Sequence, residues 1–255
     1  MTHPKTKTWH REIEFIRDPD PIPPTQQFLD DCQSFGIELS QPELEKLSAF
    51  LALLLANNQR VNMTAITDHT QAWHKHIFDA LTLLSVLADL PQTARIADVG
   101  SGGGLPAIPL AIALPNLHFT LIESTGKKAQ FIQMAANAIN LTNTTVLTAR
   151  AESLGQDKHH RAKYHAVTAR AVGPLATVAE LTIPLAQVGA IAVLTKGQRS
   201  EEELARAKPA LHTLCVRHET TFQTPTGRLI ILAKDRPTPA LYPRRDGEPK
   251  RNPLH

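Results

Sequence analysis

The feature that most constrains this chain is a glycine-rich segment at residues 98–105, Asp-Val-Gly-Ser-Gly-Gly-Gly-Leu. Residues 95–97 before it predict a short buried strand, and residues 106–114 after it predict a helix. A strand, a tight glycine turn and a helix N-terminus bring backbone N–H groups and the positive end of a helix dipole to one point. Cofactors of the nucleotide type bind at such points.

The spacing of the glycines narrows the choice of cofactor. A dinucleotide fingerprint needs a small residue at its third glycine position, where helix and strand pack closely, and this chain has Leu105 there. The pattern Asp98, Gly100, Gly102, Gly104 instead resembles the first motif of the class I S-adenosylmethionine (SAM)-dependent methyltransferases. A turn that only joins a strand to a helix rarely needs four glycines in five residues. We therefore expect SAM rather than NAD.

Composition and charge set wider bounds. The 255 residues are 42% hydrophobic, and no apolar run approaches the roughly 18–20 residues of a membrane span. The first residues lack the apolar segment of a secretory signal, so we expect a cytoplasmic protein without membrane contact. The two cysteines, Cys32 and Cys215, lie far apart and form neither a disulfide framework nor a metal knuckle.

The chain divides into four parts by pattern. Residues 1–24 are polar and end in Asp-Pro-Asp-Pro-Ile-Pro-Pro, which predicts a flexible extension. Residues 25–90 predict a small helical subdomain with helices at 26–35, 42–60 and 73–90, the second opened by a capping box at Ser40 and Glu43. Residues 91–235 predict the methyltransferase domain, and residues 236–255 form a basic tail.

An alternation of strands and helices fills residues 91–235. Strands are expected at 95–99, 118–123, 144–148, 165–169, 190–195, 214–221 and 228–233, with helices at 105–114, 125–140, 174–187 and 200–212. Only a short Pro-Thr-Gly turn separates the last two strands, so they form an antiparallel pair at the edge of an otherwise parallel sheet. The predicted fold is α/β and Rossmann-like, the seven-stranded class I SAM-dependent methyltransferase arrangement.

The ends of three further predicted strands carry candidate site residues, and they face the same crevice as the glycine turn. Glu123 ends the second strand, 23 residues after Gly100, where a carboxylate can bind both ribose hydroxyls of a nucleoside. Ala151 and Glu152 follow the third strand, where class I methyltransferases contact adenine. Arg170 ends the fourth strand, where many amino-methylating relatives carry an Asp/Asn-Pro-Pro-aromatic motif that this chain lacks.

The tail and the histidines leave alternatives open. From Thr226 to the end there are seven bases and three acids, a net charge of +4. Such a tail either contacts phosphates or is merely solvated, and charge alone favours neither. His74 and His76 are two residues apart, unlike the i, i+4 pair of a zinc helix, so we expect no metal. His76 and Asp79 share a helical face, where they either support the glycine turn or contact RNA, with Asn62 as a partner for either role. A structural hydrogen-bond network is the favoured interpretation.

Six segments occur in an order and spacing that can be compared with a known family: Asn62-Met-Thr-Ala-Ile, His76-Ile-Phe-Asp-Ala-Leu, Asp98-Val-Gly-Ser-Gly-Gly-Gly-Leu-Pro-Ala-Ile-Pro-Leu, Glu123-Ser-Thr-Gly-Lys-Lys, Arg170-Ala and Leu194-Thr-Lys-Gly. Together they resemble the GidB/RsmG family of 16S ribosomal RNA (guanine-N7) methyltransferases. The resemblance runs from about residue 25 to the C-terminus, including the tail at 237–247. Small departures occur at Ala80, Ala107 and Thr125, the last in the loop expected beside the ribose.

The resemblance implies that SAM methylates N7 of one guanine in the 530-loop region of 16S rRNA. It also implies cofactor contacts from Gly100, Leu105, Ala151, Glu152 and Arg170, with 16S rRNA or the small ribosomal subunit as partner and a monomeric enzyme.

Guanine N7 carries a lone pair and no proton, so no general base is needed, and positioning alone can lower the barrier by about 7–11 kcal/mol. Methylated guanine is cationic, so Arg170 is expected to bind the cofactor or an RNA phosphate rather than approach N7. A SAM-dependent small-molecule methyltransferase is the alternative, but the appended helices and basic tail suit a large polyanion better.

Overall fold

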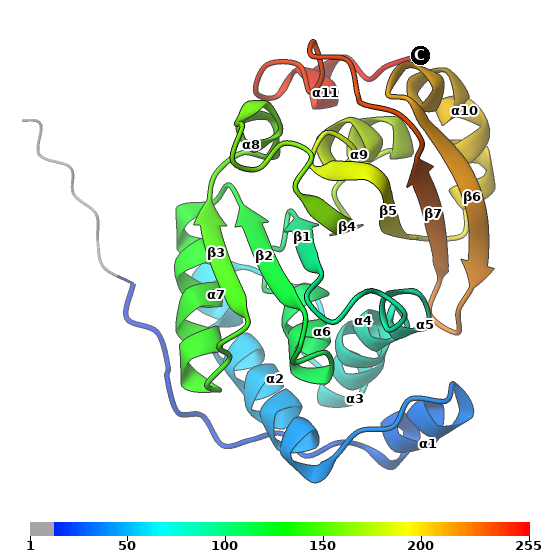
Figure 1. Cartoon of the computed structure of the whole chain (residues 1–255). Coiled ribbons are helices and arrows are strands. Elements are labelled where there is room, and N and C mark those ends of the chain that lie inside the picture. Colours follow the sequence, from blue (N-terminus) through cyan, green and yellow to red (C-terminus); the bar gives the residue numbers. More distant parts are fainter. Residues whose placement is uncertain (1–12) are drawn as a thin grey trace, which may run out of the picture.

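The computed structural model describes residues 13–255, and its centre is a seven-stranded sheet in the order β3-β2-β1-β4-β5-β7-β6 (Figure 1). The strands are β1 (Arg95–Val99), β2 (His118–Glu123), β3 (Thr144–Thr148), β4 (Tyr164–Arg170), β5 (Ala186–Lys196), β6 (Val216–Gln223) and β7 (Arg228–Lys234). The first five pair in parallel, and β7 lies antiparallel between β5 and β6. The predicted class I methyltransferase fold, with its final antiparallel hairpin, is confirmed.

Helices cover both faces of the sheet. They are α1 (Gln26–Ser34), α2 (Gln41–Val61), α3 (His69–Ala72), a π-helix η1 (Trp73–Phe78), α4 (Asp79–Leu81), α5 (Leu84–Leu87), α6 (Ala107–Ala113), α7 (Gly126–Ala138), α8 (Ala151–Gln156), α9 (Leu175–Thr182), α10 (Ser200–Thr213) and α11 (Glu248–Arg251). Helices α2, α6 and α7 pack together on one face, and α8, α9 and α10 on the other (Figure 1). No helix in the described part of the chain has the length and apolar character needed to cross a membrane.

The alternation of side chains along the strands produces two hydrophobic cores. On β1, Ile96 belongs to the core that includes α2, α6 and α7, whereas Ala97 and Val99 belong to the core that includes α8 and α9. Successive strand residues point to opposite faces, so a strand buried on both sides reads as a continuous apolar run. The two cores fix the parallel strands from both faces of the sheet. The site lies at the carboxyl ends of these strands.

The helical subdomain begins with an ordered segment and not at residue 25. Residues 13–24 form no helix or strand, yet the Ile16 N–H donates to Asn57 Oδ1 (2.8 Å), Asn57 Nδ2 donates back to the Ile16 carbonyl (2.9 Å), and Phe15 packs against Phe131. These contacts tie residues 13–24 to α2 and α7, whereas the sequence predicted a flexible extension over residues 1–24. Residues 1–12 of that extension lie outside the described residues. The predicted capping box is present, with the Ser40 N–H donating to Glu43 Oε2 (2.6 Å).

The expected continuous helix at 73–90 is broken into short pieces, with the π-helix η1 at its start. In an α-helix the Asp79 N–H would bond to the Lys75 carbonyl, but here it donates to the His74 and His76 carbonyls. The Lys75 carbonyl therefore lacks the donor that an α-helix would give it at residue 79. π-Helical turns of this kind are frequent at functional sites.

The boundary between α9 and β5 also differs from the expected one. The sequence predicted a helix to residue 187 and a strand from 190, but α9 ends at Thr182 and β5 starts at Ala186. The β4–β5 register shifts between Ala186 and Ile191, and Gly189 has φ +83° within this bulge. A glycine with positive φ is a common feature of bulges, and the irregularity hides the strand's beginning from a pattern search.

Candidate active site

The glycine-rich segment forms the turn between β1 and α6, and its backbone requires glycine. Gly100, Gly102 and Gly104 have φ values of +74°, +58° and +88°, a region that side chains disfavour. A Cβ on Gly104 would lie 2.7 Å from Cδ1 of Ile108, and a Cβ on Gly100 would lie 2.9 Å from Cγ2 of Val172. The turn can therefore pack closely against α6 on one side and against the segment after β4 on the other.

Glu123, at the end of β2, fixes this turn. Its Oε2 accepts a hydrogen bond from the Gly102 N–H (2.9 Å), and its Oε1 accepts one from the Thr125 N–H (2.7 Å). The residue is buried. Each carboxylate oxygen can accept a second bond, so the carboxylate can hold the loop and still accept from a ligand hydroxyl.

Asp98 lies beneath the turn and is fully buried. Its Oδ1 accepts a hydrogen bond from Thr168 Oγ1 on β4 (2.7 Å), whereas Oδ2 has no partner among the described residues. Burial raises the pKa of Asp98 to about 7, against the opposing effects of its hydrogen bonds and of the positive charge on Arg170. A buried oxygen without a partner is costly, and this one lies at the carboxyl end of β1.

A cavity of about 150 Å³ opens beside the turn. Its lining comes from the ends of β1 and β2, the start of α8, the segment after β4, α9 and the C-terminal tail: Val99, Gly100, Ile122, Ser124, Ala149, Arg150, Ala151, Glu152, Val172, Thr177, Leu181, Gly247 and Lys250. Pockets for ligands of drug size usually measure about 300–1,000 Å³. Val172 contributes to the small volume because its side chain lies directly against Gly100.

Arg170 points away from this cavity and into the helical subdomain. Its Nη1 donates to Asp79 Oδ2 (3.0 Å) and to the Lys75 carbonyl of the π-helix (3.0 Å). The guanidinium is not among the groups that line the cavity. Arg170 thus joins the end of β4 to the subdomain, which the sequence did not predict.

The expected network of His76, Asp79 and Asn62 exists in a different form. His76 Nε2 bonds with Thr64 Oγ1 (2.7 Å), and Asp79 pairs with Arg170. Burial, together with the nearby charge of Arg170, lowers the pKa of His76 to about 4, so the ring is neutral at pH 7. Asn62 ends α2 with φ +54° and takes no part through its side chain.

His74 and His160 have ordinary hydrogen-bond partners. His74 Nδ1 bonds with Asp31 Oδ2 (2.8 Å), and His160 Nδ1 with the Tyr164 hydroxyl (2.8 Å). Among residues 13–255, no three His, Cys, Asp or Glu side chains gather in a way that could hold a metal ion.

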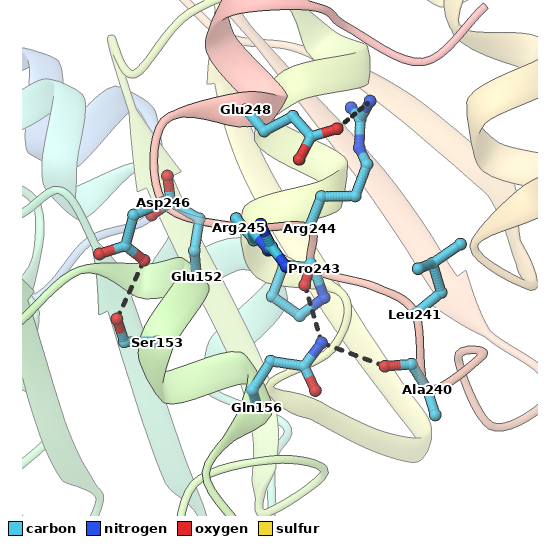
Figure 2. Close-up of a pocket in the computed structure, with 10 residues that line it drawn as sticks. All are labelled: Glu152, Ser153, Gln156, Ala240, Leu241, Pro243, Arg244, Arg245, Asp246 and Glu248. Carbon is cyan, nitrogen blue, oxygen red and sulfur yellow. Dashed lines mark hydrogen bonds and ion pairs between the residues drawn. The ribbon is translucent and has the colours of Figure 1, made fainter.

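The C-terminal tail is an ordered part of the domain, and we call residues 236–255 the C-terminal strap. It runs across α8 and α9 (Figures 1 and 2). Glu152, which was expected to contact adenine, accepts a hydrogen bond from the Gly247 N–H of the strap (2.8 Å). Gly247 and Lys250 also line the cavity, so the strap forms one of its walls.

The predicted cofactor residues therefore separate into three groups. Gly100, Ala151 and Glu152 line the cavity. Asp98, Gly102 and Glu123 lie in and beneath the glycine turn, while Leu105 is buried in the core and Arg170 faces the subdomain. Val172, Gly247 and Lys250 were missed. For Gly247 and Lys250, the only signal in the sequence was the family resemblance, which extends to the C-terminus. No sequence motif indicated Val172.

The chain matches a family model over residues 43–230, and the description of that model is "GidB: rRNA small subunit methyltransferase G". The chain belongs to the GidB family. Relatives of this family support the assignment over nearly full length. The chain is 44% identical over 225 residues to "Ribosomal RNA small subunit methyltransferase G" of Sorangium cellulosum (strain So ce56), covering 88% of this chain and 94% of that protein.

A second relative supports the family assignment, and one solved structure shares the fold. A protein of the same name from Roseiflexus sp. (strain RS-1) is 40% identical over 232 residues, covering 89% of this chain and 98% of that protein. The crystal structure of a mutant of MtNAS has a TM-score of 0.51 and 10% identity, covering 82% of each chain. At that identity the similarity concerns the fold alone.

Proposed function

We propose that this GidB family member transfers the methyl group of SAM to N7 of one guanine in the 530-loop region of 16S rRNA. The support is family membership together with the preserved glycine turn. The relatives named above are ribosomal RNA small subunit methyltransferases, and the chain has the fold and the turn that such an enzyme needs. We further propose that it acts as a monomer in the cytoplasm, where small subunits are available.

The residues at the strand ends suit SAM. Bound SAM would supply an electrophilic methyl group on a sulfonium. Glu123 has acceptor capacity left for ribose hydroxyls, and the free Oδ2 of Asp98 gives the methionine end an acceptor that lacks any other partner among the described residues. Ala151 and Glu152 line the part of the cavity proposed for adenine. Gly100 allows SAM to approach the backbone closely, provided that the Val172 side chain moves aside on binding.

The surroundings of the transfer site agree with an acceptor that carries no proton. At the end of β4 the chain reads Ala169-Arg170-Ala171-Val172, with no carboxylate or side-chain amide to orient an exocyclic amine. Arg170 is paired with Asp79 on the subdomain, so its charge is balanced and held away from the guanine that becomes cationic. The protein's task is then positioning of the base against the methyl group.

A ligand-induced stability measurement tests the cofactor assignment. A ligand present at about 100 times its Kd stabilises the folded state by about 2.7 kcal/mol, which for a chain of this length is a rise in Tm of roughly 5–11 °C. We expect SAM to raise the Tm by this amount and NAD at the same concentration to leave it unchanged. A rise with NAD, or none with SAM at saturating concentration, would contradict the assignment.

A further inference from the structure

The C-terminal strap is anchored to the domain by two sets of polar contacts, one of them on a buried carboxylate. The guanidinium of Arg161 donates to four carbonyl oxygens, those of Gly155, Thr238, Pro239 and Tyr242, at 2.6–3.1 Å. Further along, the fully buried Glu180 of α9 binds Arg244. The strap is therefore held in place and not a freely solvated tail, although the sequence left that alternative open.

The basic residues of the chain's end divide into two classes. Three have roles in the fold: Arg228 pairs with Glu201, Lys234 Nζ donates to two buried carbonyls, and Arg244 pairs with Glu180. By contrast, four are exposed and make no ion pair or side-chain hydrogen bond within the described part of the chain: Arg236, Arg245, Lys250 and Arg251. Of these four, only Arg245 and Lys250 line a hollow beside the site, and their charges are available to a partner.

Arg245 and Lys250 lie on either side of the hydrogen bond that joins Gly247 of the strap to Glu152 of α8. Lys250 lines the proposed cofactor cavity, and Arg245 lines a broader depression of about 870 Å³ (Figure 2). Glu152 belongs to the lining of both hollows, and its hydrogen bond from Gly247 separates them. Arg245 and Lys250 thus flank the mouth of the site.

The nearby carboxylates have partners of their own. Asp246 Oδ1 accepts from Ser153 Oγ (3.0 Å), and Glu248 Oε1 lies 3.7 Å from Arg244 Nη1 (Figure 2). Glu152 accepts from the Gly247 N–H. They do not pair with Arg245 or Lys250. A fixed backbone that presents unpaired cations loses little entropy on binding, and cations beside a base-modifying site suit the phosphates of a nucleic acid.

We propose that Arg245 and Lys250 bind backbone phosphates of the rRNA substrate and so hold the strand at the mouth of the cavity. The inference rests on the proposed function and extends it, since it names the surface that meets the RNA. Arg161 and Arg244, with the groups that they bind, act as the scaffold, and the exposed pair Arg245 and Lys250 provides the contact.

The salt dependence of RNA binding tests this proposal. Each phosphate contact contributes about 0.7–0.9 to the slope of log K against log salt. We expect Arg245→Gln/Lys250→Gln to lower the slope for a full-length 16S rRNA transcript by about 1.4–1.8. Between about 50 and about 200 mM salt, wild-type affinity should then fall about tenfold more than that of the variant.

A matched control removes the same charge elsewhere. Arg206 and Lys208 are exposed on α10, which lines neither hollow, so Arg206→Gln/Lys208→Gln should keep the wild-type slope. An unchanged slope in the strap variant, or an equal loss in the control, overturns the proposal. Failure of the wild-type protein to methylate 16S rRNA would instead reject the proposed function, and a methyl-transfer assay on the same samples separates the two results.

Discussion

Replacing Glu180 with alanine should lower the free energy of unfolding by about 3–5 kcal/mol, the usual cost of removing one partner from a buried ion pair. Glu180 is fully buried and accepts hydrogen bonds from the Arg244 N–H and Nε (both 2.9 Å) and from Arg244 Nη2 (2.6 Å). The substitution leaves the Arg244 N–H and Nε without their acceptor beneath the strap, and Nη2 keeps only the Asn252 carbonyl (2.8 Å). Urea unfolding of the full chain measures the loss.

An exposed glutamate provides the control. Glu201, whose side chain is 79% exposed, pairs with Arg228, and Glu201→Ala should cost less than about 1 kcal/mol. Trypsin should also cut after Arg245 and Lys250 sooner in Glu180→Ala than in Glu201→Ala, because the strap loses its anchor. Equal small losses in both variants would mean that the buried pair does not hold the strap.

Replacing Asp98 with asparagine should weaken SAM binding by about 10- to 100-fold, the loss expected for a hydrogen bond to a charged group. The substitution removes the negative charge that we assign to the cationic methionine end of SAM. In the free protein, burial raises the pKa of Asp98 to about 7, so SAM must displace a proton at lower pH. The ratio of wild-type to variant affinity should therefore rise with pH up to about 7 and level off above it, as isothermal titration calorimetry would measure.

In the free protein, the contribution of Asp98 to folding stability should fall as the pH rises, whereas its contribution to SAM binding rises. The pKa of Asp98 is about 7 when folded and 3.8 as its reference value, so the folded state binds the proton more tightly and stability falls as pH rises between these values. The lowered pKa of His76, about 4 against 6.5, acts the other way, and comparison of Asp98→Asn with wild type cancels it. The variant should gain stability relative to wild type from about pH 4 to pH 7. A pH-independent difference would contradict the buried, protonated carboxyl.

The sequence predicted the sheet well because local pattern and tertiary environment agree there. Strands such as 95–99 and 118–123 are short, mainly apolar segments that are buried after their first residue, and their predicted bounds match. The glycine turn was equally readable, since positive φ at three positions demands glycine. The β5 strand shows the limit, because a bulge at Gly189 disrupts its alternation.

The residues around the turn were harder to predict because their roles depend on partners distant in sequence. Arg170 was expected beside the cofactor, but its partners, 91 and 95 residues earlier, lie in and beside a π-helix, and nothing in the local pattern marks a π-turn. Glu152 meets Gly247, 95 residues away. The basic tail looked like one charged segment, yet Arg244 is an anchor and Arg245 is exposed. Such pairings appear only once the chain has folded.

The proposed reaction can be tested by incubating the purified protein with SAM and small ribosomal subunits from cells that lack it, then mapping methylated bases in the 16S rRNA by mass spectrometry. We expect one new 7-methylguanine, in the 530-loop region, and none when SAM is omitted. A methyl group on another atom or another RNA, or no 7-methylguanine at all, would contradict the proposal.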